Sequence, residues 1–192
     1  MVFPPEFPDE GLMLAYRDGN ASAFAALYGR HDRRVFRHIL RMVRDHSESC
    51  DLAQEVWIKV TQARRSYEPT AKFSTWLYRI VVNHVRDYFK LARNRNRAVS
   101  LDDDSTDEHE RAAVEPTIPA HEEPDRWLMR KQSSEELIAA IDRLPVPQRE
   151  ALLLHIDAGL SLDEIAATTS TSFETAKSRI RYAMKKLRDE LG

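Results

Sequence analysis

Apolar residues recur every three to four positions along most of the chain, which is the spacing that gathers them on one face of a helix. In the N-terminal half this pattern predicts four helices, and Asn20 is a suitable N-cap for the second. Their expected ranges are 11–18, 20–43, 49–65 and 74–92. The pattern returns further on, where Pro145 and Pro147 separate an amphipathic segment over 127–144 from the next helix. The periodicity therefore predicts an all-α protein.

The final 32 residues have the layout of a helix-turn-helix. Ser161 and Glu164 form a capping-box pattern at the start of a short helix, and Ser172 is placed to cap a longer one. The expected buried stripe of the longer helix contains Ala176, Ile180, Ala183, Met184 and Leu187. Over 173–188 there are six basic residues and one acidic residue. The exposed side of this helix therefore suits DNA phosphates and base edges.

The fourth predicted helix gathers aromatic and basic residues on its outer face. These residues are Trp76, Arg79, Asn83, Arg86 and Lys90. Aromatic rings beside Arg and Lys stack unpaired bases and hold the backbone, so this face, with Tyr67 and Phe73 nearby, is a candidate receptor for a base extruded from a duplex. A tryptophan beside an apolar stripe more often belongs to a core, and this alternative stays open.

The third predicted helix has a face of different chemistry. Asp51, Gln54 and Glu55 make it acidic and polar within an otherwise basic part of the chain. Such a face is unsuited to DNA and suited to a positively charged protein partner. An ordinary solvated helix face is the competing interpretation.

Charge is divided unevenly along the chain. The segment 99–125 contains ten acidic residues and one basic residue and carries -9, whereas the remainder has 28 basic and 21 acidic residues and carries +7. The segment also holds three prolines and little apolar periodicity, which predicts a flexible acidic linker. We therefore expect a helical domain over 1–98, the linker over 99–125 and a second helical domain over 126–192.

Composition narrows the function classes. The single cysteine, Cys50, leaves no internal disulfide and no cysteine-based zinc site in the monomer. The chain lacks both a run near the ~20 apolar residues of a membrane helix and the pattern of a secretion signal, so we expect a soluble, cytoplasmic protein without membrane insertion. His31 and His38, on the arginine-rich second helix, are expected at the surface. No histidine pair has metalloenzyme spacing, so we expect no catalytic residue, metal or cofactor; a metal-dependent nuclease is the competing class.

Three strings carry a resemblance to a known family: DLAQEVWIKV at 51–60, FSTWLYRIVVNHVRDYFK at 73–90 and LPVPQREALLLHIDAGLSLDEIAATTSTSFETAKSRI at 144–180. In this order and spacing they resemble regions 2 and 4 of the extracytoplasmic-function (ECF) sigma factors, group IV of the sigma-70 family. The resemblance covers roughly 10–97 and 127–190 and is specific because two separated parts agree. It implies a region 2 helical bundle and a region 4 helix-turn-helix, in a protein that guides RNA polymerase to promoters and helps to open them.

The resemblance also implies which residues bind each partner. Asp51, Gln54 and Glu55 would dock on the clamp helices of the polymerase beta-prime subunit. At the -10 element, where one base is flipped, the resemblance implies Tyr67, the loop 68–72 that ends at Lys72, and Asn83. The outer face of the fourth helix adds Trp76, Arg79, Arg86 and Lys90 to the predicted -10 residues. Those implied at the -35 element are Ser172, Thr175, Lys177, Ser178, Arg179, Arg181 and Tyr182. Tyr182 stands where many relatives place an arginine, so the -35 sequence itself does not follow from the resemblance.

Further partners come from the resemblance alone. They are core RNA polymerase, including its beta flap, promoter DNA, and an anti-sigma factor that wedges between the two domains. The main alternative is a stand-alone helix-turn-helix regulator, which would bind palindromic half-sites as a dimer. Tight binding to core polymerase distinguishes a sigma factor from such a regulator.

Overall fold

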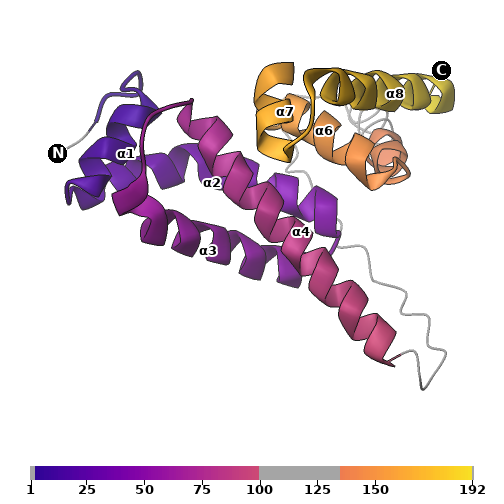
Figure 1. Cartoon of the computed structure of the whole chain (residues 1–192), viewed down its shortest axis with the longest axis horizontal. Coiled ribbons are helices and arrows are strands. Elements are labelled where there is room, and N and C mark those ends of the chain that lie inside the picture. The colour runs from indigo at the N-terminus through magenta and orange to yellow at the C-terminus, as the bar shows by residue number, and fades with distance from the viewer. Residues whose placement is uncertain (1–2, 100–134, 192) are drawn as a thin grey trace, which may run out of the picture.

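The computed structural model describes residues 3–99 and 135–191, and every regular element in these ranges is helical (Figure 1). The prediction of an all-α fold is therefore confirmed. Beyond Val99, the predicted acidic linker lies outside the described residues, and so does the stretch 126–134.

The N-terminal domain is a bundle of four helices and one short 3-10 turn. Its elements are α1 (Asp9–Arg17), α2 (Ala21–Val43), α3 (His46–Ala63), η1 (Arg64–Ser66) and α4 (Phe73–Val99). The predicted cap of α2 is present, since the side chain of Asn20 accepts a hydrogen bond from Ser22 N at 3.0 Å. Apolar residues from all four helices form the core, including Leu12, Leu27 and Val56, each fully buried. The four predicted helices are thus confirmed, and α4 extends further than its periodicity indicated.

Two histidines of α2 are buried, and the expectation that they lie at the surface is wrong. His38 is 1% exposed and packs edge-on against the Tyr78 ring, with centroids 5.5 Å apart. His31 is 8% exposed, and its Nε2 lies 2.7 Å from a carboxylate oxygen of Asp9. α2 contacts α1, α3, α4 and α6, and the stripe of α2 that carries His31, Val35 and His38 is buried against them. The arginines of this helix therefore indicate which of its faces is exposed, and they say nothing about the opposite face, where the two histidines lie.

The C-terminal domain is a helix-turn-helix preceded by two helical segments. The two preceding segments are residues 135–142 and α6 (Val146–Ile156), and the helix-turn-helix consists of α7 (Leu162–Thr169) and α8 (Phe173–Leu191). The predicted capping box is present: Ser161 Oγ accepts from Glu164 N at 3.3 Å, and Glu164 Oε2 accepts from Ser161 N at 2.8 Å. Met184 is 47% exposed, so its predicted burial is wrong. The fully buried Ala183 marks the packed edge of α8, and the next residue points about 100° away.

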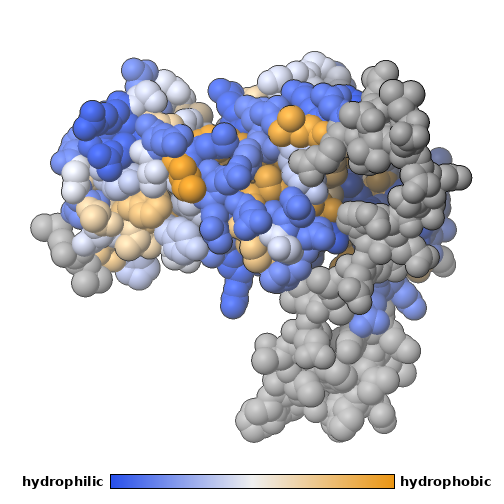
Figure 2. All heavy atoms as spheres, turned by 90° about the horizontal axis from the view of Figure 1, so that it is seen from below, coloured by the Kyte–Doolittle hydropathy of each residue, from blue (hydrophilic) through white to orange (hydrophobic). Residues whose placement is uncertain are grey.

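The two domains pack against each other. α6 and α7 lie along one side of α4 and of the C-terminal half of α2 (Figure 1). The face seen in Figure 2 is mostly hydrophilic, with scattered apolar residues. Within the described residues, no helix combines the length and apolarity needed to cross a bilayer.

Candidate functional site

α1 holds the start of α4 in place. The carboxylate of Glu10 accepts a hydrogen bond from Phe73 N at 2.6 Å, so a side chain distant in sequence caps the first turn of α4. On the same helix, Asp9 contacts both His31 and Arg30. Burial acts to raise the pKa of Asp9, but the hydrogen bonds and the electrostatic attraction of these two partners together outweigh it and hold the pKa below its ordinary value. α1 thus positions the loop that precedes α4.

Aromatic residues around this loop form part of the core. Tyr67 is 1% exposed and Phe73 is fully buried. The Tyr67 ring packs edge-on against Trp76, with centroids 5.0 Å apart, and burial raises the pKa of its phenol to about 12. The structure therefore differs from the expected open stacking platform. Of the three rings at positions 67, 73 and 76, only the Trp76 ring is partly exposed. In this conformation, Tyr67 and Phe73 support the loop from beneath.

The outer face of α4 has the predicted polar and basic residues. Arg79, Asn83 and Lys90 are exposed, and Arg86 is partly buried. Lys72, which precedes the helix, is also exposed. These five residues define what we call the α4 cationic face. Its positive charge suits the phosphates of a nucleic acid, and Asn83 offers the amide that recognises a base edge.

The predicted acidic face of α3 is solvent-accessible. Asp51, Gln54 and Glu55 are all exposed. One oxygen of Glu55 lies 2.9 Å from His84 Nε2 on α4. Burial lowers the pKa of His84 below its ordinary value, although the Glu55 carboxylate opposes this shift. Glu55 therefore connects the face of α3 to α4 while most of its carboxylate stays open to a partner.

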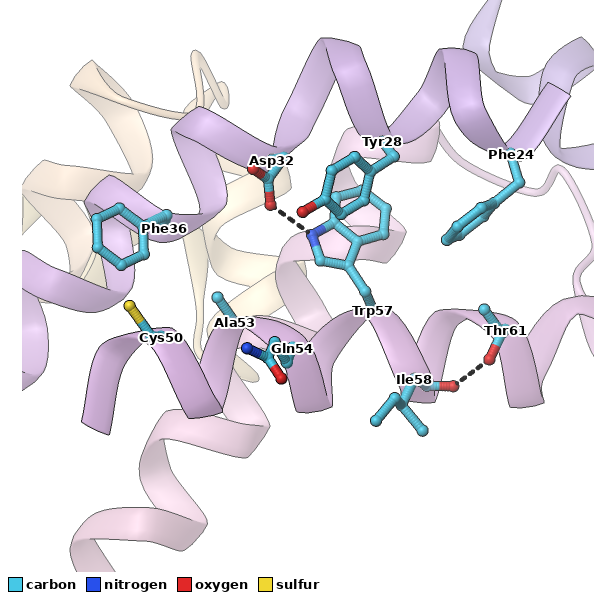
Figure 3. Close-up of a pocket in the computed structure, with 10 residues that line it drawn as sticks. All are labelled: Phe24, Tyr28, Asp32, Phe36, Cys50, Ala53, Gln54, Trp57, Ile58 and Thr61. Atoms are coloured by element: carbon cyan, nitrogen blue, oxygen red, sulfur yellow. Dashed lines mark hydrogen bonds between the residues drawn. The ribbon is translucent and has the colours of Figure 1, made fainter. Parts of the chain in front are cut away.

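Beside this face lies an apolar groove between α2 and α3, with a volume of about 500 Å³ (Figure 3). The rings of Tyr28 and Trp57 pack together there, with centroids 5.0 Å apart, and Trp57 Nε1 donates to Asp32 at 3.1 Å. Ile58, 52% exposed, lines the groove next to Gln54. The acidic face is therefore continuous with an apolar surface, a combination typical of protein interfaces. Sequence periodicity gave no sign of this groove.

The predicted DNA-reading residues of α8 lie on or near its outer surface. Ser172, Lys177, Arg181 and Tyr182 are exposed, whereas Thr175, Ser178 and Arg179 are half-buried. The Ser172 hydroxyl accepts from Thr175 N at 3.1 Å, which confirms the predicted cap. The guanidinium of Arg181 lies over the Tyr182 ring, 5.0 Å from its centroid. This contact places a cation beside an exposed ring on the outer side of α8, and both groups suit DNA.

Metal chemistry has little support in the described part of the chain. There, no group of three or more His, Cys, Asp or Glu side chains is placed to hold an ion. Cys50 Sγ lies 3.7 Å from His46 Nδ1, a two-residue contact on one helix.

Two family models match the chain: Sigma-70 region 2 over residues 27–95 and Sigma-70, region 4 over 134–187. The chain is also 33% identical over 180 residues to RNA polymerase sigma factor CarQ of Myxococcus xanthus, covering 94% of this chain and 95% of CarQ. The chain belongs to the ECF sigma factors of the sigma-70 family. It is a sigma factor of RNA polymerase and not an enzyme, which rules out the nuclease and the stand-alone regulator.

Other similarities agree with this family. The sigma factor is 28% identical to the ECF RNA polymerase sigma-E factor of Escherichia coli, covering 91% of this chain and 90% of that one. The structure of RpoE from Bartonella quintana, solved with the anti-sigma factor NepR, superposes with a TM-score of 0.68 at 23% identity. It covers 88% of this chain and 96% of RpoE, and it supports the fold. The expected region 2 and region 4 domains of this sigma factor are thus confirmed.

Proposed function

We propose that this sigma factor binds core RNA polymerase through α3 and promoter DNA through two separate faces. The α4 cationic face would recognise and help melt the -10 element, and the outer face of α8 would read the -35 element. The observation that carries this proposal is the distribution of charge: two cationic faces lie on different domains, and an acidic face adjoins an apolar groove on α3. Each face matches the chemistry of one partner.

Transcription with purified components tests this function. The sigma factor is mixed with core polymerase, passed through a gel-filtration column, and then supplied with a library of randomised promoter fragments. We expect co-elution, and transcripts whose start sites share upstream -10 and -35 motifs. Absence of both co-elution and promoter-dependent transcripts would refute the proposal.

Regulation by an anti-sigma factor belongs to the same proposal. RpoE was solved with NepR, and CnrH with the cytosolic domain of CnrY. We infer that the present sigma factor also has such a partner, that its region 4 also contacts the polymerase beta flap, and that it acts in the cytoplasm. Binding of an anti-sigma factor would then compete with core polymerase.

Arg179 provides a test of -35 recognition. If its half-buried guanidinium reads a base, Arg179→Ala should weaken binding to the selected -35 element by roughly 1–3 kcal/mol and relax the preference at one position. Fluorescence anisotropy with the selected duplex and with single-base variants measures both effects. Lys185→Ala, an exposed lysine of the same helix, is the matched control. A uniform loss across all sequences would instead assign Arg179 to a phosphate.

Asn83 provides a test of base capture at -10. Asn83→Ala should reduce the equilibrium for promoter opening by about tenfold, because a lost bidentate base contact is worth ~1–3 kcal/mol. Binding to the duplex -35 element should not change. Fluorescence of 2-aminopurine placed in the -10 element reports opening, and Asp87→Asn on the same helix is the control. Unchanged opening would argue against base capture by Asn83.

A further inference from the structure

The two domains meet along a row of polar contacts that uses the α4 cationic face. Arg86 donates through Nε and Nη2 to the two carboxylate oxygens of Glu150 on α6, at 3.1 and 2.7 Å. Near the start of α4, Lys72 Nζ lies 3.1 Å from an oxygen of Glu164 on α7. The C-terminal domain therefore presents carboxylates to the cations that the proposed function assigns to DNA.

Main-chain carbonyls of α7 complete these contacts. Arg79 donates to Ala167 O and Arg86 to Thr169 O, each at 3.3 Å. Three of the five residues of the α4 cationic face are thus engaged by the C-terminal domain. Among the described residues, no such contact is seen for Asn83 or Lys90.

A second group of contacts joins α6 and its C-terminal end to α2. Arg41 donates to both oxygens of Asp157, at 3.1 and 3.0 Å, and Arg149 donates to Met42 O at 3.3 Å. Arg149 and Glu150 are 5% and 4% exposed. Both are charged and lie side by side in the chain, and such side chains are almost never fully buried without partners. Their burial therefore indicates a specific interface between the domains.

We propose that this closed arrangement is a resting state of the free protein, in which Glu150 and Glu164 take the place of DNA phosphates on the α4 cationic face. The inference rests on the proposed function, because it assumes that this face binds promoter DNA. The Nε–Nη2 edge of Arg86 binds the Glu150 carboxylate, and Nη1 donates to Thr169 O. The edge that holds Glu150 cannot bind a phosphate at the same time. Promoter binding at -10 then requires the C-terminal domain to move off α4.

The chemistry of the interface favours reversible closure. Buried ion pairs gain little net stability, because desolvation of both charges offsets their attraction. When the domains separate, Glu150 and Arg86 regain water, so opening leaves no charge buried and unpaired. Such ion pairs determine how the two domains pack, yet they allow the domains to separate again.

The -35 face stays outside this interface. The described hydrogen bonds and ion pairs of its seven residues are made within α8 and its cap Ser172, for example between Ser172 and Thr175 and between Lys177 and Glu174. Closure therefore engages three cations of the -10 surface while leaving the -35 surface accessible. The free protein should contact DNA first through α8.

The distance between the domains tests closure without DNA. In a Cys50→Ser background, Ser47→Cys on α3 and Asp189→Cys on α8, both exposed, carry a donor and an acceptor dye in the full-length chain. We expect high energy transfer for the otherwise wild-type protein. Glu150→Arg should lower the transfer, because two guanidinium groups would then face each other. Low transfer before any interface change, or transfer unaffected by Glu150→Arg, would overturn the proposal.

Two further variants exclude trivial explanations. Arg86→Glu combined with Glu150→Arg exchanges the two charges and should recover high transfer. Asp163→Arg makes the same charge change on α7 at an exposed carboxylate that forms no ion pair within the described part of the chain, and it should behave like wild type. Circular dichroism confirms that each variant remains helical. If the charge exchange fails to restore energy transfer in a folded protein, the Arg86–Glu150 ion pair is not the contact that holds the domains together.

Binding to DNA tests the masking itself. The probe is a fluorescein-labelled single-stranded 12-mer of mixed sequence. Glu150→Arg should bind it about tenfold more tightly than Asp163→Arg, the affinity gain expected if the open fraction rises from about a tenth to most molecules. Equal affinities despite reduced transfer would overturn masking while leaving closure in place. By contrast, energy transfer that does not change on Glu150→Arg would refute closure, whatever the DNA-binding result.

Discussion

Replacing Asp51 and Glu55 together by arginine is expected to lower the affinity for core RNA polymerase by at least about 100-fold, equivalent to roughly 3 kcal/mol. Both carboxylates are exposed, so the substitutions leave the core unchanged. They turn an acidic face into a basic one, and like charges then meet a positively charged partner surface. Biolayer interferometry with immobilised core polymerase measures the dissociation constant.

The control for this prediction is a double charge reversal elsewhere. Asp163→Arg with Asp189→Arg changes the net charge equally, at exposed positions of the C-terminal domain. Its affinity should stay within a few-fold of wild type. Glu55→Gln removes only the negative charge that lies 2.9 Å from His84 Nε2, and it keeps the size of the side chain. Polymerase affinity retained by the double reversal at 51 and 55, in a protein that melts normally, would exclude docking through α3.

Acidification from pH 7 to pH 4 is expected to reduce the unfolding free energy of the N-terminal domain by roughly 3 kcal/mol through His38 alone. Burial, with a smaller contribution from Arg41, lowers the pKa of His38 from 6.5 to about 4. Between these values the unfolded chain binds a proton that the folded chain rejects. The stabilisation is therefore complete above pH 6.5 and is lost progressively as the pH falls toward 4.

Urea denaturation at several pH values, followed by tryptophan fluorescence, measures this loss. His38→Leu removes the titrating group and fills similar space, so the difference in pH dependence between wild type and variant isolates His38. No described residue forms a hydrogen bond with its Nδ1, so the apolar residue should not weaken the domain at neutral pH. His46→Leu, on the exposed start of α3, is the control. Parallel curves for wild type and His38→Leu would contradict the lowered pKa.

Local sequence patterns were sufficient for the helices and their caps. The Asn20 cap and the Ser161–Glu164 capping box form within three residues of chain, so short-range chemistry determines them. The exposed faces of α3 and α8 also follow from helical spacing, because a single helix sets which residues point outward.

Features that depend on contacts between helices could not be predicted in this way. His38 has polar neighbours in sequence, yet α2 lies at the centre of the packing and buries it. The position of Tyr67 after a helix end suggests an exposed aromatic residue, but packing against α4 buries it. Glu150 carries no signal that separates it from any exposed carboxylate; its role depends on Arg86, which is 64 residues away.

The hydrogen bond from Phe73 N to Glu10 has a consequence for where the folded unit begins. The matched region 2 starts at residue 27, so α1 lies outside it. A fragment cut at that boundary would leave Arg30 without Asp9 and its three main-chain acceptors at positions 4, 5 and 7, and the first amide of α4 without its acceptor. The minimal fragment for expression or crystallisation of the N-terminal domain is therefore set by packing, and it must include the residues from about 3 onward.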